Sequence, residues 1–81
     1  MKATVLIRPK EGILDPQGEA VGDALRTLGY DVTSARVGRL VDVELDAAGA
    51  AEAEAALAAM SRDLLANPMI ESFTIELEGS E

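Results

Sequence analysis

Residues 31–46, DVTSARVGRLVDVELD, decide the fold of this chain. Their apolar side chains recur at every second position, which is the period of a β-strand. One parity collects most of the apolar residues and the other is largely polar. The first set is Thr33, Ala35, Val37, Val41, Val43 and Leu45, and the second is Val32, Ser34, Arg36, Leu40, Asp42 and Glu44. A single apolar face therefore runs along the whole segment.

A turn at Gly38 would break this pattern. A two-residue hairpin at Gly38-Arg39 would place Asp42 and Glu44 on the apolar side of the sheet. A continuous strand keeps one apolar face, although it is longer than most strands unless it bends or bulges at Gly38. We therefore predict a long, bent strand that helps to build a homo-oligomer. A β-hairpin, giving a four-stranded ferredoxin-like sheet, stays open as the alternative.

The residues before this segment predict a strand and a helix. Residues 2–9, KATVLIRP, alternate in the same way. The side chains expected to face the core are Ala3, Val5 and Ile7. Asp15 suits the N-cap of a helix over residues 16–28, Pro16 suits its first position, and Gly29 suits the position that ends it. Gly18 and Gly22 weaken this helix and indicate the close approach of another backbone.

The residues after the segment predict a second helix and a last strand. Residues 47–66 have helical spacing, with Asp46 as a plausible cap and Asn67-Pro68 as the end. The buried face is expected to contain Ala53, Leu57, Met60 and Leu64. Residues 70–78 form the strand, and its inward residues are Phe73, Ile75 and Leu77. We expect the end, residues 79–81, to be frayed.

The element order is therefore β-α-β-α-β within a single domain, residues 1–81. We predict an α+β fold in which two helices cover one face of an antiparallel sheet. The opposite face carries Leu6, Leu40 and Ile70 among polar residues. This mixture is too apolar for an ordinary surface and too polar for a core, so it indicates a surface that contacts a partner.

Composition narrows the classes of function. The chain has 81 residues, is 48% hydrophobic and contains two aromatic residues, so its own core is small. Such a core favours a homo-oligomer or a complex subunit. The net charge of −8 disfavours nucleic-acid binding. No apolar run is long enough to span a membrane and the N-terminus lacks the layout of a signal peptide, so we expect a cytoplasmic protein.

Stand-alone catalysis is not expected. The chain has no histidine, cysteine or tryptophan, and no serine has a base to activate it. Glu11 and Asp15 are the one candidate pair of carboxylates for a hydrolase, and a solvated loop charge and a helix cap explain them better. We expect no catalytic residue, no metal and no cofactor in this chain.

Four cationic side chains near the predicted strands are candidates for binding an anion. Arg8, Lys10, Arg36 and Arg39 lie in or beside the predicted strands. Arg8 and Arg36 share the outer parity, where their guanidinium groups could bind an anionic ligand or a partner's carboxylate. Ordinary surface charge is the simpler explanation, and we favour it on the residues alone.

Residues 9–20, PKEGILDPQGEA, resemble the signature loop of the small (PurS) subunit of phosphoribosylformylglycinamidine synthase. Three further stretches resemble the same family in the same order. They are LRTLGY at residues 25–30, VGR at residues 37–39 and LANPMIE at residues 65–71. Arg39 stands where the family usually has lysine, which keeps the positive charge but changes the geometry of its hydrogen bonds.

The resemblance implies a non-catalytic subunit of an ATP-dependent glutamine amidotransferase ligase in de novo purine biosynthesis. It implies a homodimer or tetramer that bridges a large synthetase subunit and a glutaminase subunit and supports ammonia transfer. ATP and Mg²⁺ would be used by the synthetase. The partner-binding residues would be Lys10, Glu11, Gly12, Gln17, Arg36 and Arg39. A small-molecule-sensing regulatory domain with a ferredoxin-like fold is the alternative function.

Overall fold

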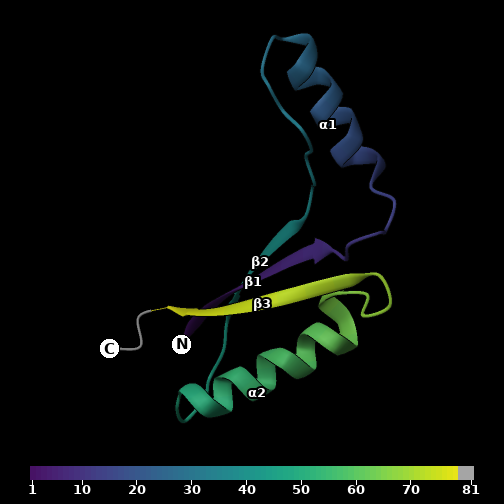
Figure 1. The fold of residues 1–81 in the computed structure, drawn as a ribbon. Helices are drawn as coiled ribbons and strands as arrows, with labels where there is room; N and C mark the ends of the chain where they lie inside the picture. The colour runs from purple at the N-terminus through teal and green to yellow at the C-terminus, as the bar shows by residue number, and fades with distance from the viewer. Residues whose placement is uncertain (79–81) are drawn as a thin grey trace.

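The computed structural model describes residues 1–78, and Figure 1 shows how their elements are arranged. The elements are β1 (Lys2–Pro9), α1 (Pro16–Thr27), β2 (Arg39–Glu44), α2 (Ala50–Met60), the π-helical turn η1 (Ser61–Leu65) and β3 (Glu71–Glu78). The expected fraying concerns residues 79–81, which lie outside the described residues.

The three strands form one antiparallel sheet in the order β2-β1-β3. Val5 of β1 lies opposite Val41 on one side and Ile75 on the other. The predicted α+β class and antiparallel sheet are confirmed. The four-stranded ferredoxin-like alternative is wrong for residues 1–78, because the chain does not turn back at Gly38. The apolar face stays intact instead, and Val41 and Val43 pack against the core.

The long strand is regular in its second half only. β2 begins at Arg39, and residues 31–38, here called the return arm, run from the end of α1 back to the sheet (Figure 1). A Cβ atom at Gly38 would lie 2.3 Å from the carbonyl oxygen of Ile7. The chain therefore crosses the end of β1 at a point where only glycine fits. We predicted a bend at Gly38 within one long strand, whereas strand β2 begins only after this glycine, at Arg39.

The position of α1 differs from the prediction that both helices cover the sheet. Only α2 lies along the sheet, whereas α1 projects beyond its end and runs beside the return arm (Figure 1). The buried residues of α1 are Gly18 and Gly22, while Val21 and Leu28 are 42% and 73% exposed. The radius of gyration is 15.8 Å, against about 12 Å for a compact domain of this length.

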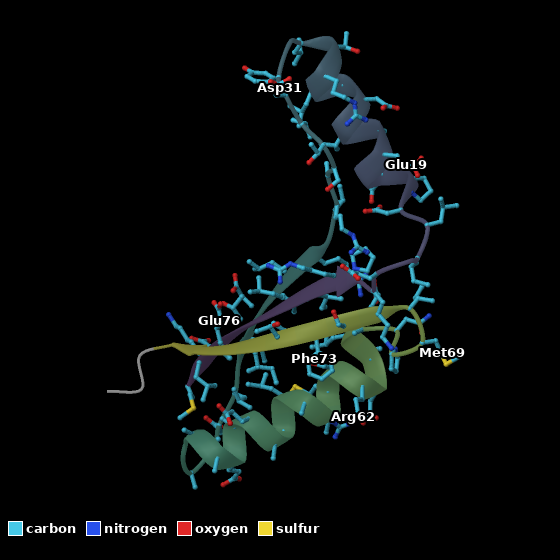
Figure 2. All side chains as sticks on the ribbon, in the orientation of Figure 1. Glu19, Asp31, Arg62, Met69, Phe73 and Glu76 are labelled. Atoms are coloured by element: carbon cyan, nitrogen blue, oxygen red, sulfur yellow. The ribbon has the colours of Figure 1, made fainter. Side chains whose placement is uncertain are left out.

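The core lies between β1 and α2. Its buried residues are Ala3, Val5, Ile7, Leu57 and Ala66. The predicted inward residues of β3 are confirmed, because Phe73, Ile75 and Leu77 pack against this cluster. Figure 2 shows Phe73 directed from β3 toward the helix. One helix and one sheet face thus supply the whole core that we observe.

The π-helical turn changes the buried face of the second helix. The backbone N–H of Ala66 donates to the carbonyl of Ser61, 2.8 Å away, so this turn holds one residue more than an α-helical turn. Leu65 consequently packs on the core, and Leu64, predicted to be buried, is 83% exposed. The helix also starts at Ala50 with Gly49 as its N-cap, rather than near Asp46.

Replacing Leu57 and Leu64 by alanine tests this rotation. Leu57 is fully buried, so Leu57→Ala should lower the free energy of unfolding by about 2–5 kcal/mol. Leu64→Ala should change it by less than about 0.5 kcal/mol. Urea denaturation followed by circular dichroism measures both. Comparable losses would mean that the helix continues without the π-helical turn.

Candidate partner-binding surface

Two loops meet at one end of the sheet. The N–H of Lys10 donates to the carbonyl of Ile70, 2.9 Å away, which joins residues 10–17 to residues 67–70. We call these two segments the loop edge. Gly12 has a φ of 84°, a conformation that other residues rarely adopt. The loop edge is the part of the molecule that contains most of the predicted partner-binding residues.

The side chains of the loop edge are largely exposed. Lys10, Glu11, Gly12 and Gln17 are all exposed. Leu14 and Met69 are 75% and 81% exposed, and Figure 2 shows Met69 extending from its loop. A hollow of about 250 Å³ lies between the loops, lined among others by Ile13, Leu14, Gln17 and Ile70. Apolar and polar groups therefore alternate on a surface that is open to a partner.

Asp15 fixes the loop edge to the return arm. Its Oδ1 accepts a hydrogen bond from the N–H of Gly18, 3.0 Å away, as the N-cap of α1. Its Oδ2 accepts from the N–H of Val37, 2.9 Å away. These two bonds, Val37 first, lower the pKa of Asp15 below its usual value. Pro16 occupies the first turn of α1, and Gly29 has a φ of 101° just after its end.

Arg36 holds the same junction from the other side. Its Nη2 donates to the carbonyls of Pro9 and Lys10, each at 2.7 Å. These carbonyls restrain the side chain but do not neutralise its charge. Gly18 completes the contact, because a Cβ there would lie 2.5 Å from the carbonyl oxygen of Ala35. The predicted close approach of a second backbone is therefore present at Gly18.

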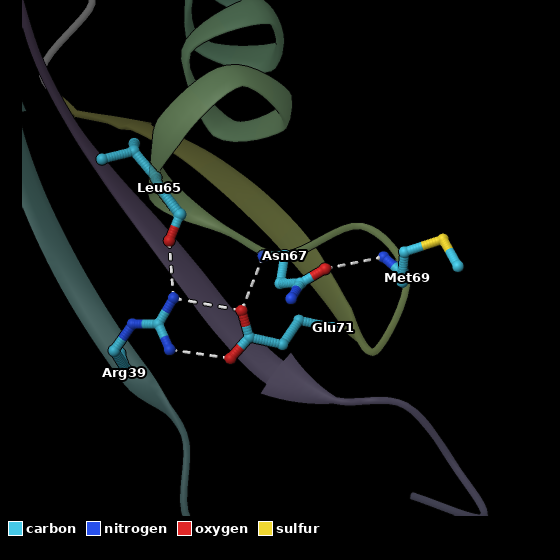
Figure 3. A network of polar contacts seen from close by, with 5 residues as sticks. All are labelled: Arg39, Leu65, Asn67, Met69 and Glu71. Atoms are coloured by element: carbon cyan, nitrogen blue, oxygen red, sulfur yellow. Dashed lines mark hydrogen bonds and ion pairs between the residues drawn. The ribbon is translucent and has the colours of Figure 1, made fainter.

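Arg39 and Glu71 form the second anchor of the loop edge (Figure 3). Arg39 Nη1 and Nη2 lie 2.7 and 3.1 Å from the two carboxylate oxygens of Glu71, and Nη2 also donates to the carbonyl of Leu65 at 2.6 Å. Glu71 Oε1 accepts from the N–H of Asn67, 2.7 Å away. The pKa of Glu71 is lowered, chiefly by Arg39 and then by Asn67, and that of Arg39 is raised by Glu71.

The six predicted partner-binding residues thus have two kinds of position. Lys10, Glu11, Gly12 and Gln17 lie on the open surface, whereas Arg36 and Arg39 make internal contacts beneath it. The prediction missed Glu71 and Asn67, which hold the loop after η1. The alternation of side chains could have pointed to Glu71. Glu71 lies on the same side of its strand as Phe73, and Arg39 lies on the same side of its strand as Val41, so both were expected on the core side of the sheet.

Within residues 1–78, no group of three or more histidine, cysteine, aspartate or glutamate side chains could hold a metal ion. In the same part of the chain, no helix is both long and apolar enough to cross a bilayer.

The pH dependence of stability tests the role of Asp15. A carboxylate with a lowered pKa in the folded state stabilises the fold above its unfolded pKa of about 3.9, and loses this effect as the pH falls through the folded value. The difference in unfolding free energy between the wild type and Asp15→Asn should therefore be constant above about pH 5 and shrink below about pH 4. Urea denaturation from pH 3 to 7 measures it. A difference independent of pH would contradict this role.

Comparison with known proteins agrees with the resemblance. The family model described as PurS, phosphoribosylformylglycinamidine (FGAM) synthase, matches residues 2–79. The chain is 41% identical to the PurS subunit of Archaeoglobus fulgidus over 76 residues, 93% of this chain and 95% of the relative. It is 40% identical to the Synechocystis subunit over 95% of this chain and 76% of the relative.

Solved structures show the same fold. The crystal structure of Methanocaldococcus jannaschii PurS superposes with a TM-score of 0.86 at 32% identity, covering 99% of this chain and 98% of that one. A chain in the PurLQS structure from Thermotoga maritima superposes with a TM-score of 0.85 at 25% identity, covering 93% of both. Family match, sequence identity and fold agree over nearly the full length, and the chain belongs to the PurS family of FGAM synthase subunits.

Proposed function

We propose that this chain, a subunit of FGAM synthase in purine biosynthesis, joins the synthetase and glutaminase subunits and supports ammonia transfer between them. FGAM synthase is a ligase complex in which the PurS subunit is not catalytic on its own. The PurLQS structure from Thermotoga maritima contains a chain of the same fold. This family membership does not favour the alternative function, a small-molecule-sensing regulatory domain.

The observation that carries the proposal is the loop edge. Its exposed side chains stand on backbone that is restrained by Asp15, Arg36 and Arg39. A loop that is already ordered loses little conformational entropy when it binds a partner. We therefore assign partner contacts to Lys10, Glu11, Gly12 and Gln17, and the support of those contacts to Arg36 and Arg39.

We also propose that two copies associate through α1 and the return arm. The return arm makes no strand pairing within residues 1–78. Val21 of α1 is 42% exposed, and Leu28 and Tyr30, which follow the helix, are 73% and 61% exposed. An exchange of these segments would give each sheet further strand partners and a second covering helix. The small core of one copy favours such an arrangement.

The remaining parts of the proposal concern the partners. ATP and Mg²⁺ are assigned to the synthetase subunit, because this chain offers no phosphate loop in its sequence. The cytoplasm is the proposed compartment. No nucleic-acid or membrane partner is proposed for an acidic chain of this kind.

Reconstitution of the complex tests the bridging role. Synthetase and glutaminase subunits are assayed with this chain, using either glutamine or ammonia as the nitrogen source. Omission of the chain should abolish glutamine-dependent turnover and affect ammonia-dependent turnover less. The variant Lys10→Glu with Gln17→Ala should weaken assembly by roughly tenfold or more, as expected for contact residues near the centre of an interface.

The control for this assay is Glu54→Ala, a change of an exposed residue on α2 away from the loop edge. It should assemble like the wild type. Equal glutamine-dependent turnover with and without the chain would overturn the bridging role. Normal assembly of the Lys10 and Gln17 variant would overturn the assignment of the loop edge alone.

Leu28→Asp tests the dimer. A charge on the apolar side of α1 should shift the chain from dimer to monomer, because it would be buried on association. Leu64→Asp is a matched control, since Leu64 is 83% exposed and lies on η1 instead. Sedimentation equilibrium measures the mass of each. A dimer that persists in Leu28→Asp, or a wild-type monomer, would contradict the exchange of α1.

A further inference from the structure

A basic hollow lies on the outer face of the sheet, opposite α2. Its volume is about 290 Å³, and its lining includes Arg8, Arg36, Leu6 and Leu40 but no acidic residue. Gly38 also lines it, and a Cβ atom at this glycine would lie 3.4 Å from the Cα of Arg8. Because glycine adds no side chain beside Arg8, the hollow stays open to a ligand.

Two guanidinium groups in this basic hollow keep their full positive charge. Among residues 1–78, Arg8 takes part in none of the ion pairs. Within the same residues, Arg36 donates from Nη2 alone, to two backbone carbonyls at 2.7 Å, which leaves Nη1 and Nε for another acceptor. Arg39, which also lines the hollow, is paired with Glu71 instead. In a chain with a net charge of −8, an anionic group from outside would therefore meet two cations without carboxylates here.

We propose that the basic hollow binds a carboxylate side chain of the larger subunit that docks on the loop edge. The planar groups of Arg8 and Arg36 would donate hydrogen bonds to the two carboxylate oxygens. The inference rests on the proposed function, because it extends the contact assigned to the loop edge. The basic hollow and the hollow between the loops share Pro9, Gly38 and Arg39 in their linings. A subunit that covers the loop edge therefore reaches the basic hollow across the end of β1.

The apolar residues of the basic hollow favour a protein segment over a small anion. Leu6 of β1 lies opposite Leu40 of β2, and Leu40 is 58% exposed. A free phosphate or carboxylate would leave these leucines in water. Leu6 and Arg8 are two positions apart on one strand, which is about 6.6 Å. Alternate residues of an extended segment, one acidic and one apolar, would therefore meet the arginine and cover the leucine.

Exclusion of water makes such a contact stronger than an ion pair on the surface of the single chain. An exposed pair contributes little, because water and salt screen it. In a docked interface, loss of one charge leaves the other buried without a partner. The carbonyls that already hold Arg36 reduce the conformational freedom that it loses on binding. Asp42 and Glu44 line a separate hollow on the same face, and they would repel a carboxylate there and so orient the segment.

Charge reversal at Arg8 tests this contact in the reconstituted complex. The measured quantity is the concentration of this chain that gives half-maximal glutamine-dependent turnover with the two larger subunits. Arg8→Glu should raise this concentration by about tenfold or more, since it places like charges opposite one another. Arg8→Lys keeps the charge but loses the fork of donors, so its increase should be smaller. Arg62→Glu makes the same change of charge at an exposed position on η1 and should behave like the wild type.

Photo-crosslinking in the same complex identifies the occupant. A photoreactive group placed at Leu40 and another placed at Met69 should label the same larger subunit, and the Leu40 label should lie beside an acidic residue. A Leu40 label on any other chain, or none, would overturn the inference, as would wild-type behaviour of Arg8→Glu. Inorganic phosphate that raises the Tm of the isolated wild type but not of Arg8→Glu would assign the hollow to a small anion instead. Equal turnover with and without the chain would contradict the bridging role itself.

Discussion

The carboxylate of Asp15 constrains the rest of the structure, because it binds two backbone segments that are far apart in the sequence. One oxygen caps α1 and the other accepts the N–H of Val37, so the start of the helix and the end of the return arm form one junction. Gly18 and Gly38 let the backbones approach closely enough for this. With both ends of the segment held there, α1 extends away from its own sheet. The chain therefore leaves an apolar helix side and an unpaired arm exposed.

The contact between Arg39 and Glu71 contributes more to the position of a loop than to the stability of the fold. Arg39 is 51% exposed as a side chain, so its ion pair with Glu71 is screened by water and adds little to the free energy of folding. The same guanidinium also binds the carbonyl of Leu65, and Glu71 binds the N–H of Asn67. These bonds connect β2, η1 and β3 across the end of β1. Their main effect is to fix the loop that carries Met69. Lysine, usual in the family here, could not make this fork of bonds.

The sequence predicted those features that follow from a simple period or a local cap. Alternation placed Val5 and Ile75 on the core side, and the same argument favoured one bent strand over a hairpin at Gly38, which the strand order β2-β1-β3 then settled. It could not place α1. An apolar stripe shows that one side of a helix has to be buried, but it does not show whether the sheet of the same chain or another chain buries it. Nor could it show the π-helical turn, since one extra residue at Ser61 leaves no mark on composition and yet exchanges Leu64 for Leu65 in the core. At the loop edge, the exposed residues and the Asp15 cap were predictable, but the pairing of Arg39 with Glu71 was not. Strand parity places both on the core side without giving the strand order that brings together two residues 32 positions apart.

These features have a common physical origin in the small amount of surface that the chain can bury alone. A single helix on a three-stranded sheet encloses a core of alanine, valine, isoleucine and leucine, with Phe73 at its margin. A larger private core would require α1 to fold back, and the junction at Asp15 prevents this. The chain instead keeps two apolar surfaces open while its loop edge stays ordered without a partner. In a symmetric assembly, each added copy would bring one more loop edge in a fixed orientation. The same constraint that weakens the single chain would therefore give an adaptor repeated and rigidly placed binding surfaces.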